Sequence, residues 1–96
     1  MRKKDMARVL DQYDLDRISP SEYPYLLRSL GVLRRDGSVS IINLRLLHQA
    51  LILRIVPEEA WERGPEGVEP ILTSITPESK LLWYVDDLWK QYNGEE

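Results

Sequence analysis

The sequence predicts a small, mainly α-helical (α+β) single domain, spanning residues 1–96, with four to five helices and one short β-hairpin. Two Ser/Thr-Pro pairs followed closely by Glu, at Ser19 and Thr76, are typical of helix starts. An almost continuous apolar run over residues 43–56 predicts a buried helix. Asp36-Gly37 separates two short β-type runs, which favours a hairpin.

Capping residues and apolar spacing define the first two helices. Apolar residues three and four positions apart predict a helix from about Lys3 to Tyr13. A second helix is predicted from Pro20 to Leu30, because Ser19 can cap it and Glu22 completes a capping box. Gly31 is expected to end this helix as a left-handed C-cap.

The hairpin is predicted over two β-type runs, 32–35 and 38–41. Asp36-Gly37 between them favours a two-residue turn in which both central residues have positive φ. Ile18 could pair as a third strand. A helix that leads directly into such a hairpin predicts a winged-helix-like or helix–loop–helix arrangement.

The chain is predicted to consist of a core followed by a loop and a C-terminal helix. We expect residues 1–60 to form this core, with the 43–56 helix buried on most sides and a short helix starting at Pro57. Residues 62–76 are predicted to form an acidic Gly/Pro loop. Residues 77–92 are predicted to form a C-terminal aromatic helix that docks on the 43–56 helix.

Composition argues against several classes of function. The chain has no cysteine and one histidine, His48, and it carries no Gly-rich phosphate loop and no HExxH or GxSxG motif. We therefore expect a protein that is not an enzyme and that uses no cofactor or metal. The run over residues 44–56 is too short and too polar to span a bilayer, so we expect a cytoplasmic protein with no membrane contact.

The charge is divided between the two halves of the chain. Residues 1–54 hold ten Lys/Arg and six Asp/Glu, whereas residues 55–96 hold three Lys/Arg and ten Asp/Glu. The net charges of +4 and −7 could neutralise each other in the fold, face nucleic acid, or meet the opposite half of a second copy in a homodimer.

All three tryptophans fall in the last 36 residues. The apolar residues of the last helix cover more than one face, which is typical of a helix with one contact inside the fold and one outside. Tryptophan and tyrosine are favoured anchors of protein interfaces. The predicted interface residues are Trp61, Leu82, Trp83, Tyr84, Trp89 and Tyr92.

Arginines at and near the hairpin suggest a second function. Guanidinium groups bind phosphate oxygens in a bidentate geometry, and a winged domain places such groups on its wing. The predicted nucleic-acid contacts are Arg28, Arg34, Arg35 and Arg45.

The segment from Tyr13 to Glu22 resembles an EF-hand calcium loop. In that family an apolar residue precedes an Asp-x-Asp start, and Ile and Glu follow at positions eight and twelve. Asp14, Asp16, Ile18 and Glu22 match when three residues are deleted after Asp16, which removes the third ligand and the glycine. The resemblance implies a degenerate EF-hand-like helix–loop–helix module.

Three functions thus follow from the sequence. The leading prediction is a small non-enzymatic regulatory or adaptor protein that binds a protein partner through its C-terminal aromatic helix and acidic segment 58–69. The alternative is a DNA-binding regulator that uses the hairpin arginines. The third is the EF-hand-like module.

Overall fold

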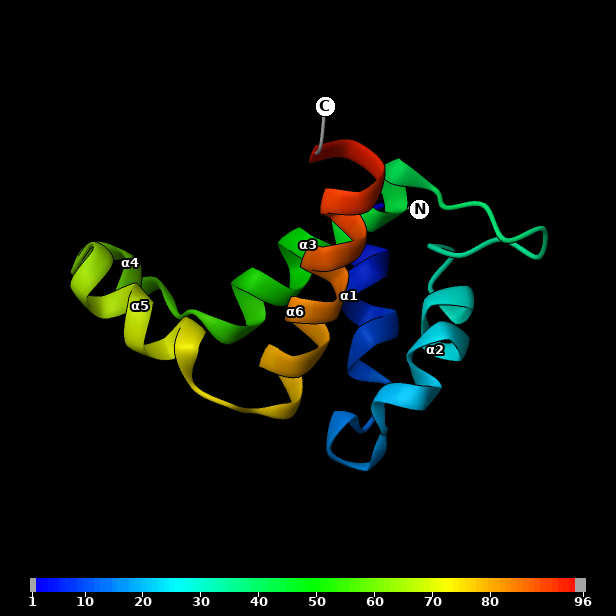
Figure 1. Ribbon diagram of the computed structural model, residues 1–96. Helices are drawn as coiled ribbons and strands as arrows, with labels where there is room; N and C mark the ends of the chain where they lie inside the picture. The colour runs from blue at the N-terminus through cyan, green and yellow to red at the C-terminus, as the bar shows by residue number, and fades with distance from the viewer. Residues whose placement is uncertain (1, 95–96) are drawn as a thin grey trace.

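The computed structural model describes residues 2–94, and within them the chain is mainly helical, as predicted (Figure 1). Two 3₁₀ turns, Leu15–Arg17 and Pro20–Glu22, lie between the first two α-helices, and a π-helical turn over Lys90–Gly94 follows the last one. The α-helices are α1 (Lys3–Asp11), α2 (Tyr23–Ser29), α3 (Ile41–Ile55), α4 (Glu58–Glu62), α5 (Pro65–Thr73) and α6 (Pro77–Trp89).

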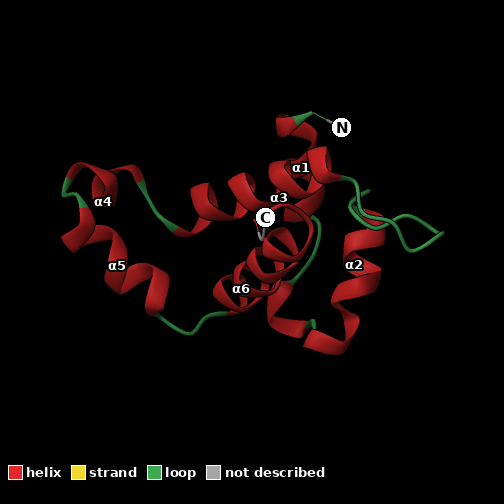
Figure 2. Cartoon of the chain, turned by 45° about the horizontal axis from the view of Figure 1, so that its top comes forward, coloured by secondary structure: helices red, strands yellow, loops and turns green. Residues whose placement is uncertain are grey.

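The core is built around α3, which packs most extensively on α6 and next on α1. Leu44, Leu47 and Leu51 of α3 are fully buried, as are Leu81 and Val85 of α6. The predicted docking of the C-terminal helix on the apolar helix is therefore confirmed. Figure 2 shows α1, α3 and α6 grouped together, with α2 on one side and the α4–α5 hairpin projecting on the other.

The second predicted helix is divided into a 3₁₀ turn and α2. Pro24, the second residue of α2, has no N–H and crowds the carbonyl four residues earlier, so the first turn over Pro20–Glu22 is 3₁₀. The Glu22 carboxylate accepts hydrogen bonds from the Ser19 N–H at 3.1 Å and the Ser19 hydroxyl at 3.0 Å. These bonds lower the pKa of Glu22.

The predicted two-stranded hairpin is reduced, within residues 2–94, to one isolated antiparallel bridge between Leu33 and Val39. Its turn is also different: Gly37 has φ +88°, whereas Asp36 does not have positive φ. The Gly37 N–H donates to the Arg34 carbonyl at 3.1 Å, and the Arg34 N–H donates to the Ser38 carbonyl at 2.9 Å. This is a three-residue loop with a glycine bulge.

The Asp36 side chain explains why the tighter turn does not form. Its carboxylate accepts hydrogen bonds from the Ser38 N–H at 2.9 Å and the Ser38 hydroxyl at 2.6 Å, and these bonds lower its pKa. Ile18, proposed as a third strand, instead ends the Leu15–Arg17 turn. The winged arrangement expected from three short strands is therefore not formed by the described residues.

Replacing Gly37 with alanine should destabilise the fold, because an L-residue with a side chain is strained at φ +88°. We expect the free energy of unfolding to fall by about 1 to 2 kcal/mol, measured by urea denaturation. Arg35→Ala is the matched control, since Arg35 is exposed in the same turn and does not have positive φ. Equal stability of the two variants would contradict the bulge geometry.

The predicted acidic loop 62–76 contains helix α5, so this prediction is wrong over Pro65–Thr73. Pro65 occupies the first helical turn, where a missing N–H costs little. Gly67 lets α5 cross α4 closely, because a Cβ at this position would lie 2.7 Å from the Ala60 carbonyl oxygen. No residue of α5 is fully buried.

Two features of α3 and α6 complete the fold. α3 begins two residues earlier than predicted, and its Ile42 and Leu53 are 73% and 56% exposed, so it is less enclosed than expected. The Thr76 hydroxyl caps α6 by accepting a hydrogen bond from the Ser79 N–H at 3.1 Å. Across residues 2–94, no helix is long and apolar enough to cross a membrane.

Candidate functional site

The six predicted interface residues fall into three groups. Trp61, Trp83 and Tyr92 are 46%, 40% and 50% exposed. Tyr84 and Trp89 are half-buried against the core, and each has a partner: the Tyr23 ring lies 5.2 Å from that of Tyr84, and the Arg45 guanidinium lies 6.0 Å from that of Trp89.

Leu82 is the residue that the structure removes from the predicted interface. It is 6% exposed and belongs to the core. Successive helical residues point about 100° apart, so Leu82 faces inward while its neighbour Trp83 faces outward. The sequence pattern gave no means of choosing which of these two neighbours is buried.

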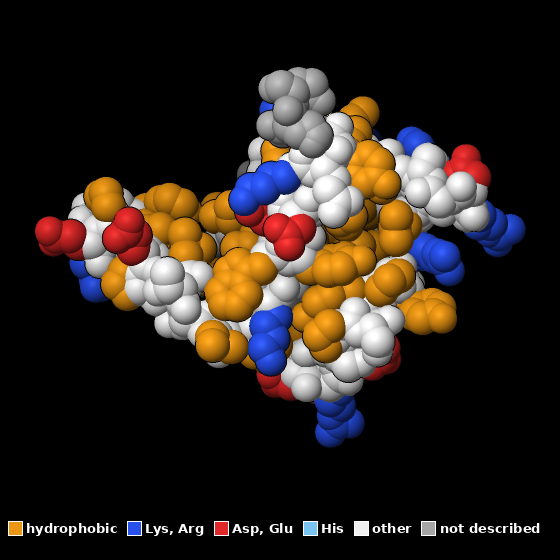
Figure 3. Space-filling model, viewed as in Figure 1, with side chains coloured by type: hydrophobic (Ala, Val, Ile, Leu, Met, Phe, Trp, Pro, Cys, Tyr) orange, Lys and Arg blue, Asp and Glu red, His pale blue; other side chains and the backbone are white. Residues whose placement is uncertain are grey.

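Three of the seven large exposed hydrophobic side chains in the described part of the chain, Trp61, Ile75 and Trp83, belong to α4, to the loop after α5 and to α6, whereas Tyr25, Ile42, Leu53 and Tyr92 lie on other elements. We define the aromatic surface as Trp61 of α4, Val68 and Leu72 of α5, Ile75 of the following loop and Trp83 of α6. Ile75 is 74% exposed, which is high for a side chain of this size. Figure 3 shows hydrophobic side chains extending from the α4–α5 hairpin toward the centre of the molecule. The α5 residues lie in a segment expected to be a loop, so sequence reasoning missed them.

Two cavities lie along the aromatic surface. One, of about 360 Å³, is lined by Trp61, Gly64, Pro65, Val68 and Glu69. The other, of about 260 Å³, lies between α3, α5 and α6 and is lined by His48, Ile52, Leu72, Leu82, Trp83 and Asp86. The walls of both cavities are mainly apolar. Each cavity is also lined by one carboxylate, Glu69 in the first and Asp86 in the second.

The single histidine is part of a small charged cluster at the second cavity. His48 Nε2 lies 3.4 Å from one Asp86 oxygen, and Lys90 Nζ lies 3.3 Å from the other. His48 is half-buried between α3 and α6, which agrees with the boundary position expected for a lone histidine on an apolar helix. The contact with Asp86 links α3 to α6.

The predicted nucleic-acid residues lie in two places. Arg34 and Arg35 are exposed on the projecting turn, and Arg28 is exposed on α2, 5.8 Å from the Tyr25 ring. Figure 3 shows Lys and Arg side chains on this side of the molecule. Arg45 instead packs over Trp89, beside His48. Among the described side chains, none of these four arginines forms an ion pair.

The residues of the EF-hand resemblance do not form a calcium site. The Asp14 carboxylate accepts a hydrogen bond from the Asp16 N–H at 3.1 Å, and Glu22 caps the Ser19 turn. No group of three His, Asp or Glu in the described part of the chain could hold a metal ion. The segment lacks the three residues that would supply the third ligand and the glycine, and the Asp14 and Glu22 carboxylates instead accept local hydrogen bonds.

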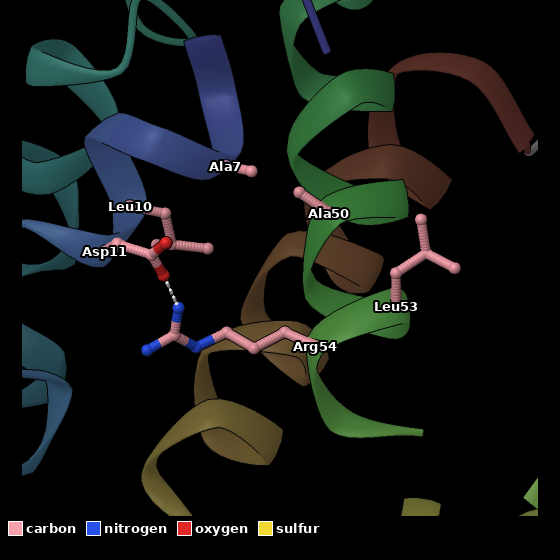
Figure 4. Close-up of a pocket in the computed structure, with 6 residues that line it drawn as sticks. All are labelled: Ala7, Leu10, Asp11, Ala50, Leu53 and Arg54. Carbon is pink, nitrogen blue, oxygen red and sulfur yellow. Dashed lines mark hydrogen bonds and ion pairs between the residues drawn. The ribbon is translucent and has the colours of Figure 1, made fainter. Parts of the chain in front are cut away.

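A further cavity of about 250 Å³ lies between α1 and α3 (Figure 4). Ala7 and Ala50 leave space between the helices, and the ion pair between Arg54 and Asp11 spans one end. These two charges lie 43 residues apart in the sequence, so no local pattern could have found the pair. The two opposite charges pair with each other across the gap between α1 and α3.

Comparison with protein-family models, with curated proteins and with solved structures finds no match for this chain.

Proposed function

We propose that the protein is a non-enzymatic regulatory or adaptor protein that binds a protein partner through its aromatic surface. The observation that carries this proposal is that Trp61 and Trp83, which are 46% and 40% exposed, each line an apolar cavity, and that Ile75 is 74% exposed in the loop between α5 and α6. Large apolar side chains concentrated at one place on a small domain mark an interaction site more often than a scattered distribution does.

The chemistry of these side chains supports binding. Tryptophan contributes a large contact area with few rotatable bonds, and tryptophans dominate the energetics of many interfaces. α5 has no fully buried residue, so the projecting hairpin has apolar area to bury against a partner.

The test is quantitative affinity capture followed by calorimetry with the purified partner. The double variant Trp61→Ala/Trp83→Ala should weaken binding by about 2 kcal/mol or more, which is the usual threshold for hot-spot residues. Ile42→Ala is the matched control, because Ile42 is 73% exposed at the N-terminal end of α3. If the double variant captures the same proteins with the same affinity, the proposal is wrong.

A second candidate function is nucleic-acid binding at the turn. Arg34 and Arg35 side by side on a projecting turn, with Arg28 exposed on the preceding helix, favour it. Guanidinium groups in such a position can contact phosphates without displacing an internal ion pair.

If this second function holds, Arg34→Ala/Arg35→Ala should weaken binding to random duplex DNA. The slope of log K against log salt is negative, and removing two phosphate contacts should reduce its magnitude by about two. Gel shifts at several salt concentrations measure the slope, with Arg17→Ala as the control on another surface. An unchanged slope would rule out phosphate contact by this turn.

A further inference from the structure

We propose that the partner segment is a basic amphipathic helix, with an apolar ridge seated along α5 and Lys or Arg on its flanks. This inference rests on the proposed function, because it assigns an occupant to the aromatic surface. Its three supports are the shape of the surface, the charge around it, and the burial of the chain's own basic helix.

The apolar residues of the surface form a row that matches a helix. Val68 and Leu72 are four positions apart on α5, so they lie on one face about 6 Å apart along its axis; both are half-buried, and Leu72 also packs against the core. One cavity adjoins Val68 and the other adjoins Leu72. A helix laid along α5 presents side chains at i and i+4 with the same spacing, one for each cavity.

The charge around this row selects a cationic partner. Residues 58–80 carry six Glu and two Lys/Arg, for a net charge of −4. Among the side chains that the structure describes, none of the six glutamates between residues 58 and 78 forms an ion pair with Lys or Arg. Glu69 stands at the edge of the first cavity. Opposite charges on a partner would be attracted here and like charges repelled.

A second copy of this chain fits the aromatic surface less well than a different protein does. Its basic helix α1 carries Lys4 and Arg8 on the outside, but its apolar residues Met6 and Leu10 are buried in its own core. Ile42 and Leu53, the exposed apolar residues of α3, lie eleven positions apart at opposite ends of that helix. Neither helix therefore offers a free apolar ridge flanked by cations.

The test uses three synthetic helical peptides of roughly five turns, with identical leucine ridges and with Lys, Gln or Glu on the flanks. Fluorescence anisotropy measures their binding to the full chain. We name the peptides Leu/Lys, Leu/Gln and Leu/Glu after their ridge and flank residues. We expect the Leu/Lys peptide to bind roughly tenfold tighter than the Leu/Gln peptide, and we expect this difference in affinity to shrink as the salt concentration rises. Leu/Glu should bind weakest. Trp83→Ala should weaken Leu/Lys binding by about tenfold or more, whereas Ile42→Ala should leave it unchanged.

A variant that removes two glutamate charges tests the charge selection separately. Glu66→Gln/Glu69→Gln keeps the shape of two exposed side chains and removes their charge, so it should reduce the preference for Leu/Lys over Leu/Gln. An unchanged preference would overturn the assigned role of these glutamates.

Each remaining outcome decides against the inference in a distinguishable way. Equal binding of all three peptides through Trp83 overturns the charge selection and leaves the proposed function standing. If Leu/Lys binding is unchanged by Trp83→Ala, the peptide is attracted to an acidic protein in general, and docking at the aromatic surface is overturned. Failure of all three peptides overturns the helix as occupant, while partner capture still decides the proposed function. A dimer in sedimentation that Trp83→Ala dissociates identifies a second copy as the occupant.

Discussion

A chain that ends at Thr76 should show no cooperative unfolding transition. Without α6, the face of α3 that packs against it is exposed, and Leu81, Leu82 and Val85 no longer contribute to the core. Burying a side chain of this size contributes about 1.5 to 3 kcal/mol, and the total stability of a domain is about 5 to 15 kcal/mol. The loss of three such residues is therefore comparable with the stability of the whole fold.

Circular dichroism during heating measures this directly, with a chain that ends at Tyr92 as the control. A truncated chain that melts at the same temperature and with the same sharpness as the full chain would contradict the central place of α6 in the core.

Leu81→Ala should lower the free energy of unfolding by about 2 to 5 kcal/mol. Leu81 is fully buried, so truncation loses the transfer free energy of its methyl groups and leaves a cavity beside α3. Leu88, seven residues later on α6, is only half-buried, so Leu88→Ala should cost less. Urea denaturation followed by circular dichroism gives both values, and a larger loss for Leu88→Ala would contradict the orientation of the helix.

The helices that the sequence predicted correctly are those with a local signal. Ser19 and Thr76 mark helix starts because a capping residue and a following proline act within one turn. The apolar run that forms α3 was also found directly, since long apolar runs must be buried whatever their neighbours. Mainly helical character therefore followed from short-range chemistry.

The hairpin and the acidic loop were mispredicted because competing local effects decide them. Asp36 and Gly37 favour a two-residue turn, but the Asp36 carboxylate bonds to Ser38 and the turn widens by one residue. Gly64 and Pro65 are typical of a loop, yet proline in a first helical turn also starts a helix. Gly67 allows that helix to pack closely against α4, a contact that no sequence pattern reveals.

Residue type nominated the candidate interface residues, but the direction of each side chain could not be predicted from the sequence. Trp61 and Trp83 are exposed as an interface requires, whereas Leu82 is buried because helix rotation turns it toward α3. Val68 and Leu72 were missed because they belong to the unexpected helix α5. The acidic character of the surface was visible in the sequence, since charge counts do not depend on folding.

The proposed binding role of the aromatic surface is tested most directly by the indole N–H signals of the three tryptophans in an NMR titration with the purified partner. Trp61 and Trp83 lie on the aromatic surface, whereas Trp89 is half-buried beneath Arg45 and serves as the internal reference. We predict that the Trp61 and Trp83 signals shift as the partner saturates while the Trp89 signal stays in place. Saturated binding that leaves the Trp61 and Trp83 signals unmoved would contradict the proposed function.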